Sequence, residues 1–389
     1  MPSVSLGSYA QNQNEVKKLR TAAGFLTLLA MAILLLSSSG TLVAQGCVVA
    51  HSVGEIGGPD SDGGYLQPKH WQLTLDYRHL YSFRHFVGSV AQEYRQQSNT
   101  EVRNRINTFD AGLTYQITPR FSAVVLVPVQ FASRRYYIAA DSLSPTSPAS
   151  SIVGNWGVSG LGDISFVGQG WIWDPTKNPK HNIQIGFGLQ TPTGRDNIAN
   201  NLVEIPGQPA VTATADYSIQ PGIGVWAIPV SLESFQAINN SLQVYLNGDY
   251  LFSTQETNNV ANSSPPGFPA PAAQNAFIAT ADEYLIQAGF GYMVAKVHGL
   301  TLTAGLRKEG VPAHNAFTAN EGFRRPGYAY SFEPGVIYSM HGGHDLITAN
   351  IDRAIYRNRV ASVPDLQLGQ HGDAAFADWL WLASYQHRF

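Results

Sequence analysis

The chain has 389 residues, with 24 Lys and Arg against 27 Asp and Glu, and its formal net charge of −3 gives no basic footprint for nucleic acid. Only 13% of its residues are charged, where a soluble globular protein carries about 25%. Beyond the N-terminal region no uninterrupted apolar run approaches the roughly 18 residues that a spanning helix needs. The composition therefore argues against both an ordinary soluble protein and a helical membrane protein.

The first 46 residues have the organisation of a signal peptide. A short basic segment precedes an apolar stretch at 24–36, and the sequence at 44–46 is a small-x-small cleavage pattern. We expect 1–46 to be removed on export, with an uncleaved membrane anchor as the alternative. Cys47 is the only cysteine, so no disulfide forms within the chain, and its place after the cut raises lipid attachment as a second alternative.

Residues 47–69 are rich in Gly, Pro, Ser and Asp, which predicts a flexible periplasmic tail or a plug. From His70 onward, apolar and polar residues alternate with the two-residue period of half-exposed strands. Twelve such stretches lie near 70–83, 106–117, 121–135, 157–172, 181–192, 218–231, 241–254, 282–295, 300–312, 327–340, 345–357 and 375–389.

The connections between these stretches alternate between short and long, which is typical of outer-membrane barrels with tight periplasmic turns and longer outer loops. An open sheet edge in lipid would leave main-chain groups unsatisfied, so the strands must close. We therefore predict an all-β fold in which 70–389 form a transmembrane antiparallel β-barrel of about 12 strands in the cell outer membrane. A soluble β-sandwich is the alternative, but it does not explain aromatic residues near strand ends.

One face of each stretch is acceptable to lipid, and charged residues fall mainly on the other. In the first stretch Trp71, Leu73, Leu75 and Tyr77 share the apolar face. The charged residues predicted to line the lumen are Asp76, Arg78, Asp110, Asp163, Asp249, Arg307, Glu309, Glu333, Asp352 and Arg388. Their acidic excess predicts a mild cation preference, while a structural ion-pair network filling a narrow barrel is the other interpretation. Arg353 falls on the lipid parity, and we expect a bulge to turn it inward.

The chain ends in WLWLASYQHRF, in which aromatic residues alternate back from the terminal Phe389. This pattern resembles the C-terminal strand that the barrel-insertion machinery reads in outer-membrane proteins. We expect Trp381, Tyr385 and Phe389 to form that assembly signal.

Three further segments carry a resemblance to known proteins: FDAGLTYQITPRFSAVVLVPVQ at 109–130, GLGDISFVGQGWIW at 160–173 and GFGLQTPTGRDN at 186–197. With the terminal Phe strand, they resemble a family of Gram-negative outer-membrane proteins named after the MetA pathway of phenol degradation and described as transporters. The resemblance implies a barrel for uptake or efflux of small, often hydrophobic or aromatic compounds, and it carries no catalytic residue.

Other candidate chemistry is weak. His341 and His344 lie in a short turn with only Asp345 beside them, too few ligands for a typical zinc site. Serines and histidines occur in the long loops without a nucleophile motif (Ser142, Ser144, His314 and His371). We therefore predict no catalytic residue, metal or cofactor. We expect a barrel through which a small-molecule solute passes passively. Its expected partners are outer-membrane lipid and the barrel-assembly machinery. A structural or adhesive barrel and a lipase-type enzyme are the alternatives.

Overall fold

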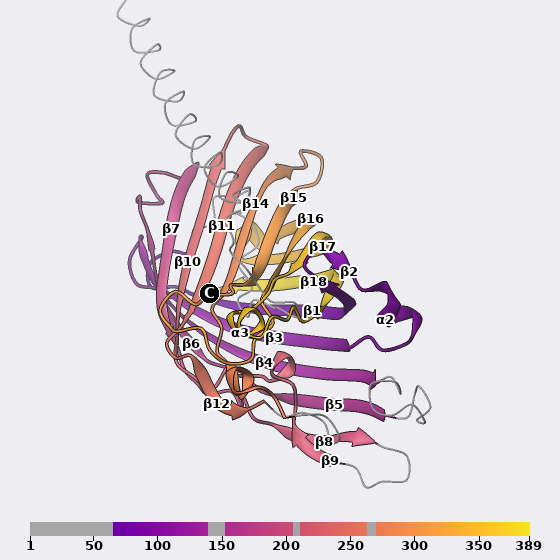
Figure 1. Cartoon of the computed structure of the whole chain (residues 1–389). Helices are drawn as coiled ribbons and strands as arrows, with labels where there is room; N and C mark the ends of the chain where they lie inside the picture. The colour runs from indigo at the N-terminus through magenta and orange to yellow at the C-terminus, as the bar shows by residue number, and fades with distance from the viewer. Residues whose placement is uncertain (1–64, 139–151, 205–210, 263–269) are drawn as a thin grey trace, which may run out of the picture.

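The computed structural model describes residues 65–138, 152–204, 211–262 and 270–389. The expected signal peptide, Cys47 and most of the expected tail lie outside these residues. Twelve antiparallel strands close into a barrel, because β1 pairs with both β3 and β18 (Figure 1). In order around the wall they are β1 (Trp71–Val87), β3 (Arg103–Gln116), β4 (Phe121–Ile138), β6 (Ser165–Trp171), β7 (His181–Gln190), β10 (Ala227–Ala237), β11 (Leu242–Ser253), β14 (Glu283–Met293), β15 (Leu300–Val311), β16 (Gly327–Met340), β17 (Asp345–Arg359) and β18 (Ala374–Arg388).

The predicted closed barrel of about 12 strands is thus confirmed, and most strand limits agree within a few residues. The stretch expected at 157–172 is divided into β5 (Ile152–Leu161) and β6, with 162–164 between them. The stretch expected at 218–231 was wrong in its limits, because β10 begins only at Ala227. Both differences occur on the same side of the barrel, and both matter for the candidate site.

The outward face of the barrel is apolar, as the alternation predicted. Leu75, Phe166 and Leu302 each leave almost half of their surface exposed, whereas neighbouring inward side chains such as Thr74 and Thr301 are buried. So wide a surface of large apolar side chains is unfavourable in water and favourable in contact with lipid. The alternation therefore describes a barrel whose outside contacts the hydrocarbon of a membrane.

One end of the barrel has short turns and the other carries longer connections. The short turns join, for example, β3 to β4 and β16 to β17, where η4 (His341–Gly343) lies. The longer connections contain β2 (Val90–Ala91), α2 (Glu93–Gln97), β8 (Ala199–Glu204), β9 (Val211–Thr214), η2 (Tyr217–Ile219), β12 (Thr257–Ala261), η3 (Ala273–Asn275), β13 (Phe277–Ala279) and α3 (Val363–Gln367). We call these the periplasmic and the outer end, respectively. In the described ranges, no helix has the length and apolar character to cross a membrane.

The expectation for Arg353 was wrong. A bulge does occur in β17, but it lies beyond Arg353, between the pairs Tyr330–Tyr356 and Ser331–Ala354. Arg353 pairs with the outward Phe332, and its guanidinium carbon lies 4.6 Å from the centre of the Trp379 ring. Arg353 therefore stays on the outward face, where the Trp379 ring stabilises its charge, and no bulge turns it inward.

The apolar core lies inside the outer half of the barrel. Residues 215–226, which we call the inward segment, leave the wall before β10, and Ile219 within them is completely buried. Ile219 belongs to a cluster of inward side chains from several strands and from the inward segment: Leu80, Ile106, Ala132, Trp156, Val158, Ala215, Leu380 and Leu382. The inward segment therefore fills part of the lumen.

Candidate functional site

Four charged side chains from three adjacent strands meet inside the barrel. The Arg307 guanidinium on β15 donates to the Glu309 carboxylate through Nη2 at 2.7 Å and Nε at 3.0 Å. Its Nη1 lies 3.9 Å from Glu333 on β16, and its Nε lies 3.6 Å from Asp352 on β17. One cation is thus shared by three carboxylates. All four side chains are nearly inaccessible to water, where such charges are stable only when paired and hydrogen-bonded.

Two of these carboxylates differ in how well they are satisfied. Glu333 accepts hydrogen bonds from the amides of Gln287, at 2.9 and 3.1 Å, and of Asn350, at 2.7 Å. Neither carboxylate oxygen of Asp352 has a hydrogen-bond partner among the described residues, so its proximity to Arg307 is its main compensation. Asp352 is therefore the member of the network best able to contact water or a solute.

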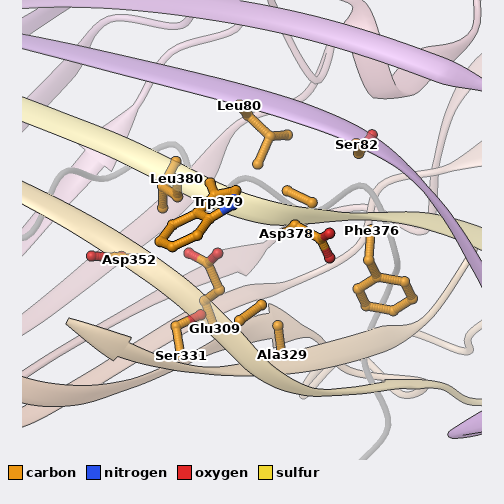
Figure 2. Close-up of a pocket in the computed structure, with 12 residues that line it drawn as sticks. Leu80, Ser82, Glu309, Ala329, Ser331, Asp352, Phe376, Asp378, Trp379 and Leu380 are labelled. Atoms are coloured by element: carbon orange, nitrogen blue, oxygen red, sulfur yellow. The ribbon is translucent and has the colours of Figure 1, made fainter.

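Asp352 also lines a pocket between β1 and β18 on one side and β15 to β17 on the other (Figure 2). The lining combines acidic side chains with apolar ones: Leu80, Ser82, Glu309, Ala329, Ser331, Asp352, Ala354, Phe376, Ala377, Asp378, Trp379 and Leu380. The pocket has room for about two or three water molecules. In this state the lumen beside the network admits water-sized groups, and a larger solute requires movement.

The inward segment is held by ions as well as by its apolar contacts. Asp216 lies 3.2 Å from the Arg134 guanidinium of β4 and pairs with Arg325 from the loop before β16. Its carboxylate also accepts from the Ser218 hydroxyl at 2.6 Å. Burial alone would raise the pKa of Asp216, but Arg134 and Arg325 hold it well below its usual value. The segment is therefore anchored to two separate parts of the barrel by one ionised carboxylate.

The wall beside the inward segment is not continued by strand pairing. β4 pairs with β6 up to Leu126–Ser165 and with β5 from Val129–Leu161 onward. β6 pairs with β7, which ends at Gln190, whereas on that side the pairing of β5 among the described residues is with β8 alone. We call the region between β5 and the ends of β7 and β10 the wall interruption. Leu161, Leu189 and Trp226 around it are outward and more than 40% exposed, so it lies within the apolar belt.

Asp163 holds two loop segments together at this interruption through hydrogen bonds. Its Oδ1 accepts from the Gly194 main-chain N–H at 2.8 Å, and its Oδ2 accepts from the Ile223 N–H at 2.7 Å. The segments that carry these two groups are themselves in very close contact, because a Cβ on Gly194 would lie 2.8 Å from the Gly222 Cα. Glycine is needed for this approach. Asp163, which was predicted to line the lumen, is buried and joins the wall to the loop at Gly194 and to the inward segment at Ile223, a contact that we call the latch.

The other predicted lumen residues fall into three groups. Arg78 and Asp110 are buried on the inward face of β1 and β3, and Asp76 lies directly opposite Asp110. Asp249 is half-buried on the inward face of β11. Arg388 lies at the periplasmic end, where it donates to the Gln72 side chain and the Gly343 main-chain oxygen, each at 3.1 Å. The structure brings Arg307, Glu309, Glu333 and Asp352 together, and the selectivity role of every residue in the set stays a prediction.

The sequence did not identify the residues that hold the inward segment. Gln130 on β4 donates to the main-chain oxygens of Ile219 and Gln220, at 2.8 and 3.1 Å. Arg134 and Asp216 complete the attachment. The available signal was their parity, since Gln130 and Arg134 are polar residues on the inward face of β4.

The structure shows the contacts of the C-terminal strand and of the loop residue His371. Trp381 and Phe389 are exposed, the Tyr385 hydroxyl donates to Asp345 at 2.7 Å, and the Phe389 N–H bonds the Trp71 oxygen. Their role in assembly stays a prediction. His371 contacts the Arg359 main-chain oxygen at 2.9 Å, and Ser142 and Ser144 lie outside the described residues. Within the described ranges no group of three or more His, Cys, Asp or Glu side chains is arranged to hold a metal ion.

Comparison with solved structures identifies the same fold in a crystal structure of an outer membrane channel from Pseudomonas putida F1. The two chains are 14% identical with a TM-score of 0.53, and the match covers 84% of this chain and 98% of the other. Less similar are the toluene transporters TbuX of Ralstonia pickettii (11% identity, 84% and 91% coverage, TM-score 0.39) and TodX of Pseudomonas putida (9%, 89% and 96%, 0.41). No family model and no curated protein matches the sequence.

The first likeness establishes the fold, and at 14% identity it establishes no more than that. Combined with the closed barrel and its apolar outward belt, it places the protein in the outer membrane, as the sequence predicted.

Proposed function

We propose that the protein is an outer-membrane channel through which small, apolar molecules pass without an energy source. The observation that carries the proposal is the apolar cluster around Ile219, which lies inside the barrel and directly beside the wall interruption. Apolar side chains in a lumen favour an apolar solute over an ion, because contact with them removes apolar surface from water. The resemblance of 109–130, 160–173 and 186–197 to the phenol-degradation family makes aromatic compounds the proposed cargo.

The charge network suggests where such a solute leaves the barrel. To continue toward the periplasmic end it would have to pass Arg307 and its three carboxylates, which are buried and strongly coupled to one another. Separating buried ion pairs costs several kcal/mol, in the range of about 3 to 5. Displacing the two loop segments at Asp163 breaks the hydrogen bonds from Gly194 and Ile223 and those that Thr193 forms with Gly162 and Ile164, but it separates no ion pair. It opens toward lipid, where an apolar solute is soluble. We therefore propose a sideways exit through the wall interruption.

Uptake measurements in whole cells test this function. A Gram-negative host that expresses the chain should take up radiolabelled toluene faster than the same host without it, while uptake of a charged solute of similar size stays unchanged. Ile219→Asn places a polar amide in the apolar cluster and should slow toluene uptake severalfold. Leu366→Asn is the matched control, because Leu366 lies on α3 with 67% of its surface exposed.

The alternative functions give different results in the same cells. Equal toluene uptake with and without the folded protein would contradict a channel for apolar molecules and leave a structural or adhesive barrel. Release of fatty acids from added phospholipid would instead support the lipase-type enzyme.

A further inference from the structure

The connection between β1 and β3 is tied to the barrel by a buried histidine. This connection, residues 88–102, carries β2 and α2 at the outer end, and we call it the α2 connection (Figure 1). His85 lies near the end of β1 with 4% of its surface exposed. Its Nε2 accepts from the Val102 N–H at 2.8 Å, and its Nδ1 lies 2.9 Å from Oδ2 of Asp373, just before β18. One ring thus joins the α2 connection to the start of the last strand.

His85 lies beyond the membrane-spanning part of β1. Near the periplasmic end the Trp71 ring contacts Tyr115, with ring centres 4.6 Å apart, as expected of an interfacial aromatic girdle. His85 follows fourteen residues later on the same strand. With a strand tilt of roughly 40°, fourteen residues rise about 35 Å along the membrane normal, whereas the apolar band of such barrels is about 25 Å high. The ring therefore lies on the outer side of the membrane, where the pH is that of the medium.

The two contacts of the ring determine its protonation state. A main-chain N–H can only donate, so Nε2 must be the unprotonated nitrogen, and Nδ1 must carry the hydrogen that His85 donates to Asp373. The ring is therefore neutral in this arrangement. A second proton would bind to Nε2, where two N–H groups would then face each other at a distance that suits a donor and an acceptor. Protonated His85 therefore cannot keep its contact with Val102.

The charged groups around the ring also favour its neutral form. Burial of the ring is the largest effect and lowers the pKa of His85, because a charged ring would lose its contact with water. Asp373 acts in the opposite direction, but this carboxylate also forms an ion pair with Arg95 of α2. Arg95 and Arg134 of β4 add to the lowering. These groups face the ring from α2, β4 and the segment before β18, and their combined effect opposes a second proton.

The α2 connection packs against side chains that reach the pocket of the lumen. Ala91 of the connection contacts the apolar cluster formed by Phe86, Ala374 and Phe376. The rings of Phe86 and Phe376 meet edge to face with their centres 5.5 Å apart, and Phe376 lines the pocket. Release of the connection would therefore remove packing from one wall of the pocket.

From this geometry we propose that protonation of His85 releases the α2 connection from the barrel and loosens the adjacent wall of the pocket. The closed arrangement accepts only the neutral ring. The ratio of released to closed connection therefore rises by up to tenfold for each pH unit between the ordinary histidine pKa of about 6.5 and the lowered pKa of the closed state. This switch is independent of the proposed transport function, in which the latch at Asp163 limits toluene uptake.

Hydrogen exchange of the full chain in detergent, measured by mass spectrometry, tests the switch. Exchange in peptides that cover 93–102, divided by the intrinsic rate at each pH, should rise on the order of tenfold from pH 7.5 to pH 5. Peptides from the periplasmic turn at 118–120 should not change. His85→Gln offers an acceptor oxygen to the Val102 N–H and cannot be protonated, so its exchange in 93–102 should be equal at the two pH values.

The matched control is His298→Gln, which removes an exposed histidine from the periplasmic end and should keep the pH dependence of the parent. A second variant, Val102→Pro, retains His85 but lacks the N–H group, and its exchange in 93–102 should be raised at both pH values. Equal exchange of the folded parent at pH 7.5 and pH 5 would overturn the proposal. So would a rise that persists in His85→Gln, because another group would then be responsible. Folding of each variant is checked by heat-dependent migration on gels.

Discussion

Replacing Asp163 with asparagine tests the latch at the wall interruption. In the native protein the carboxylate accepts from the N–H groups of Gly194 and Ile223 at 2.8 and 2.7 Å. An asparagine amide keeps one acceptor oxygen and presents an NH2 donor to the second N–H. One buried N–H therefore loses its partner, while the shape of the side chain is nearly unchanged.

The size of the effect follows from the strength of such bonds. A hydrogen bond to a charged group contributes about 1.5 to 3 kcal/mol. Loss of one such bond should destabilise the closed arrangement by about 2 kcal/mol, and each 1.36 kcal/mol corresponds to a tenfold change in an equilibrium. The ratio of open to closed protein should then rise by roughly 30-fold. If the closed state predominates in the parent, toluene uptake per folded barrel should rise by up to the same factor.

Toluene uptake by cells that express equal amounts of folded barrel provides the assay. Asp174→Asn is the matched control, because Asp174 also accepts from a main-chain N–H, that of Thr176 at 3.0 Å, but does so in a turn at the periplasmic end. Uptake by the control should equal that of the parent. If the folded Asp163→Asn protein transports toluene within twofold of the parent, the latch does not control passage and the sideways exit is wrong.

Three further predictions concern the lumen. Because the pKa of Asp216 is lowered in the folded protein, its carboxylate stabilises the inward segment fully at every pH above the ordinary Asp pKa of about 3.9, and this stabilisation declines as the pH falls from there toward the lowered pKa. Uptake should therefore be constant from pH 8 to 5 and begin to rise only below about pH 4. Arg307→Gln leaves three buried carboxylates without their cation and should destabilise the barrel by about 3 to 5 kcal/mol in urea titrations. Asp352→Asn, in contrast, should leave the stability unchanged or raise it, and it should lower the cation preference of the conductance. A side chain at Gly305 would lie 2.6 Å from the Tyr245 hydroxyl, so Gly305→Val should cost about 1 to 3 kcal/mol in the same titration.

The wall of the barrel was predictable because its cause is local. A strand between lipid and lumen needs a period of two, and this period predicted the number of wall strands, the limits of most of them and the outward parity of residues such as Leu75 and Phe332. The assignment failed at 218–231 for a physical reason. Ile219, Val225 and Ala227 have the same parity and are all buried, but only Ala227 belongs to a strand. Alternation reports which side chains are buried and contains no information on whether the main chain pairs.

The partners of Asp163 were not predictable for a different reason. Glycines in a strand region are typical of a close main-chain approach, and the structure contains one at Gly-Leu-Gly-Asp, residues 160–163. The groups that approach, however, are the N–H groups of Gly194 and Ile223, which lie 31 and 60 residues further along the chain. Main-chain donors have no residue-type signature, so a carboxylate that binds them has the same appearance in sequence as one that faces water.

The charged residues of the lumen separate into two roles that parity alone could not distinguish. Glu333 is satisfied by Gln287, Asn350 and Arg307, which is the arrangement expected of a structural ion network in a narrow barrel. Asp352 shares the same cation, accepts no hydrogen bond among the described residues and lines the pocket. A buried carboxylate of this kind raises the energy of the closed state unless water or a passing cation contacts it. We therefore expect any cation preference of the barrel to depend on Asp352 far more than on Glu333, although the two lie on neighbouring strands of one network.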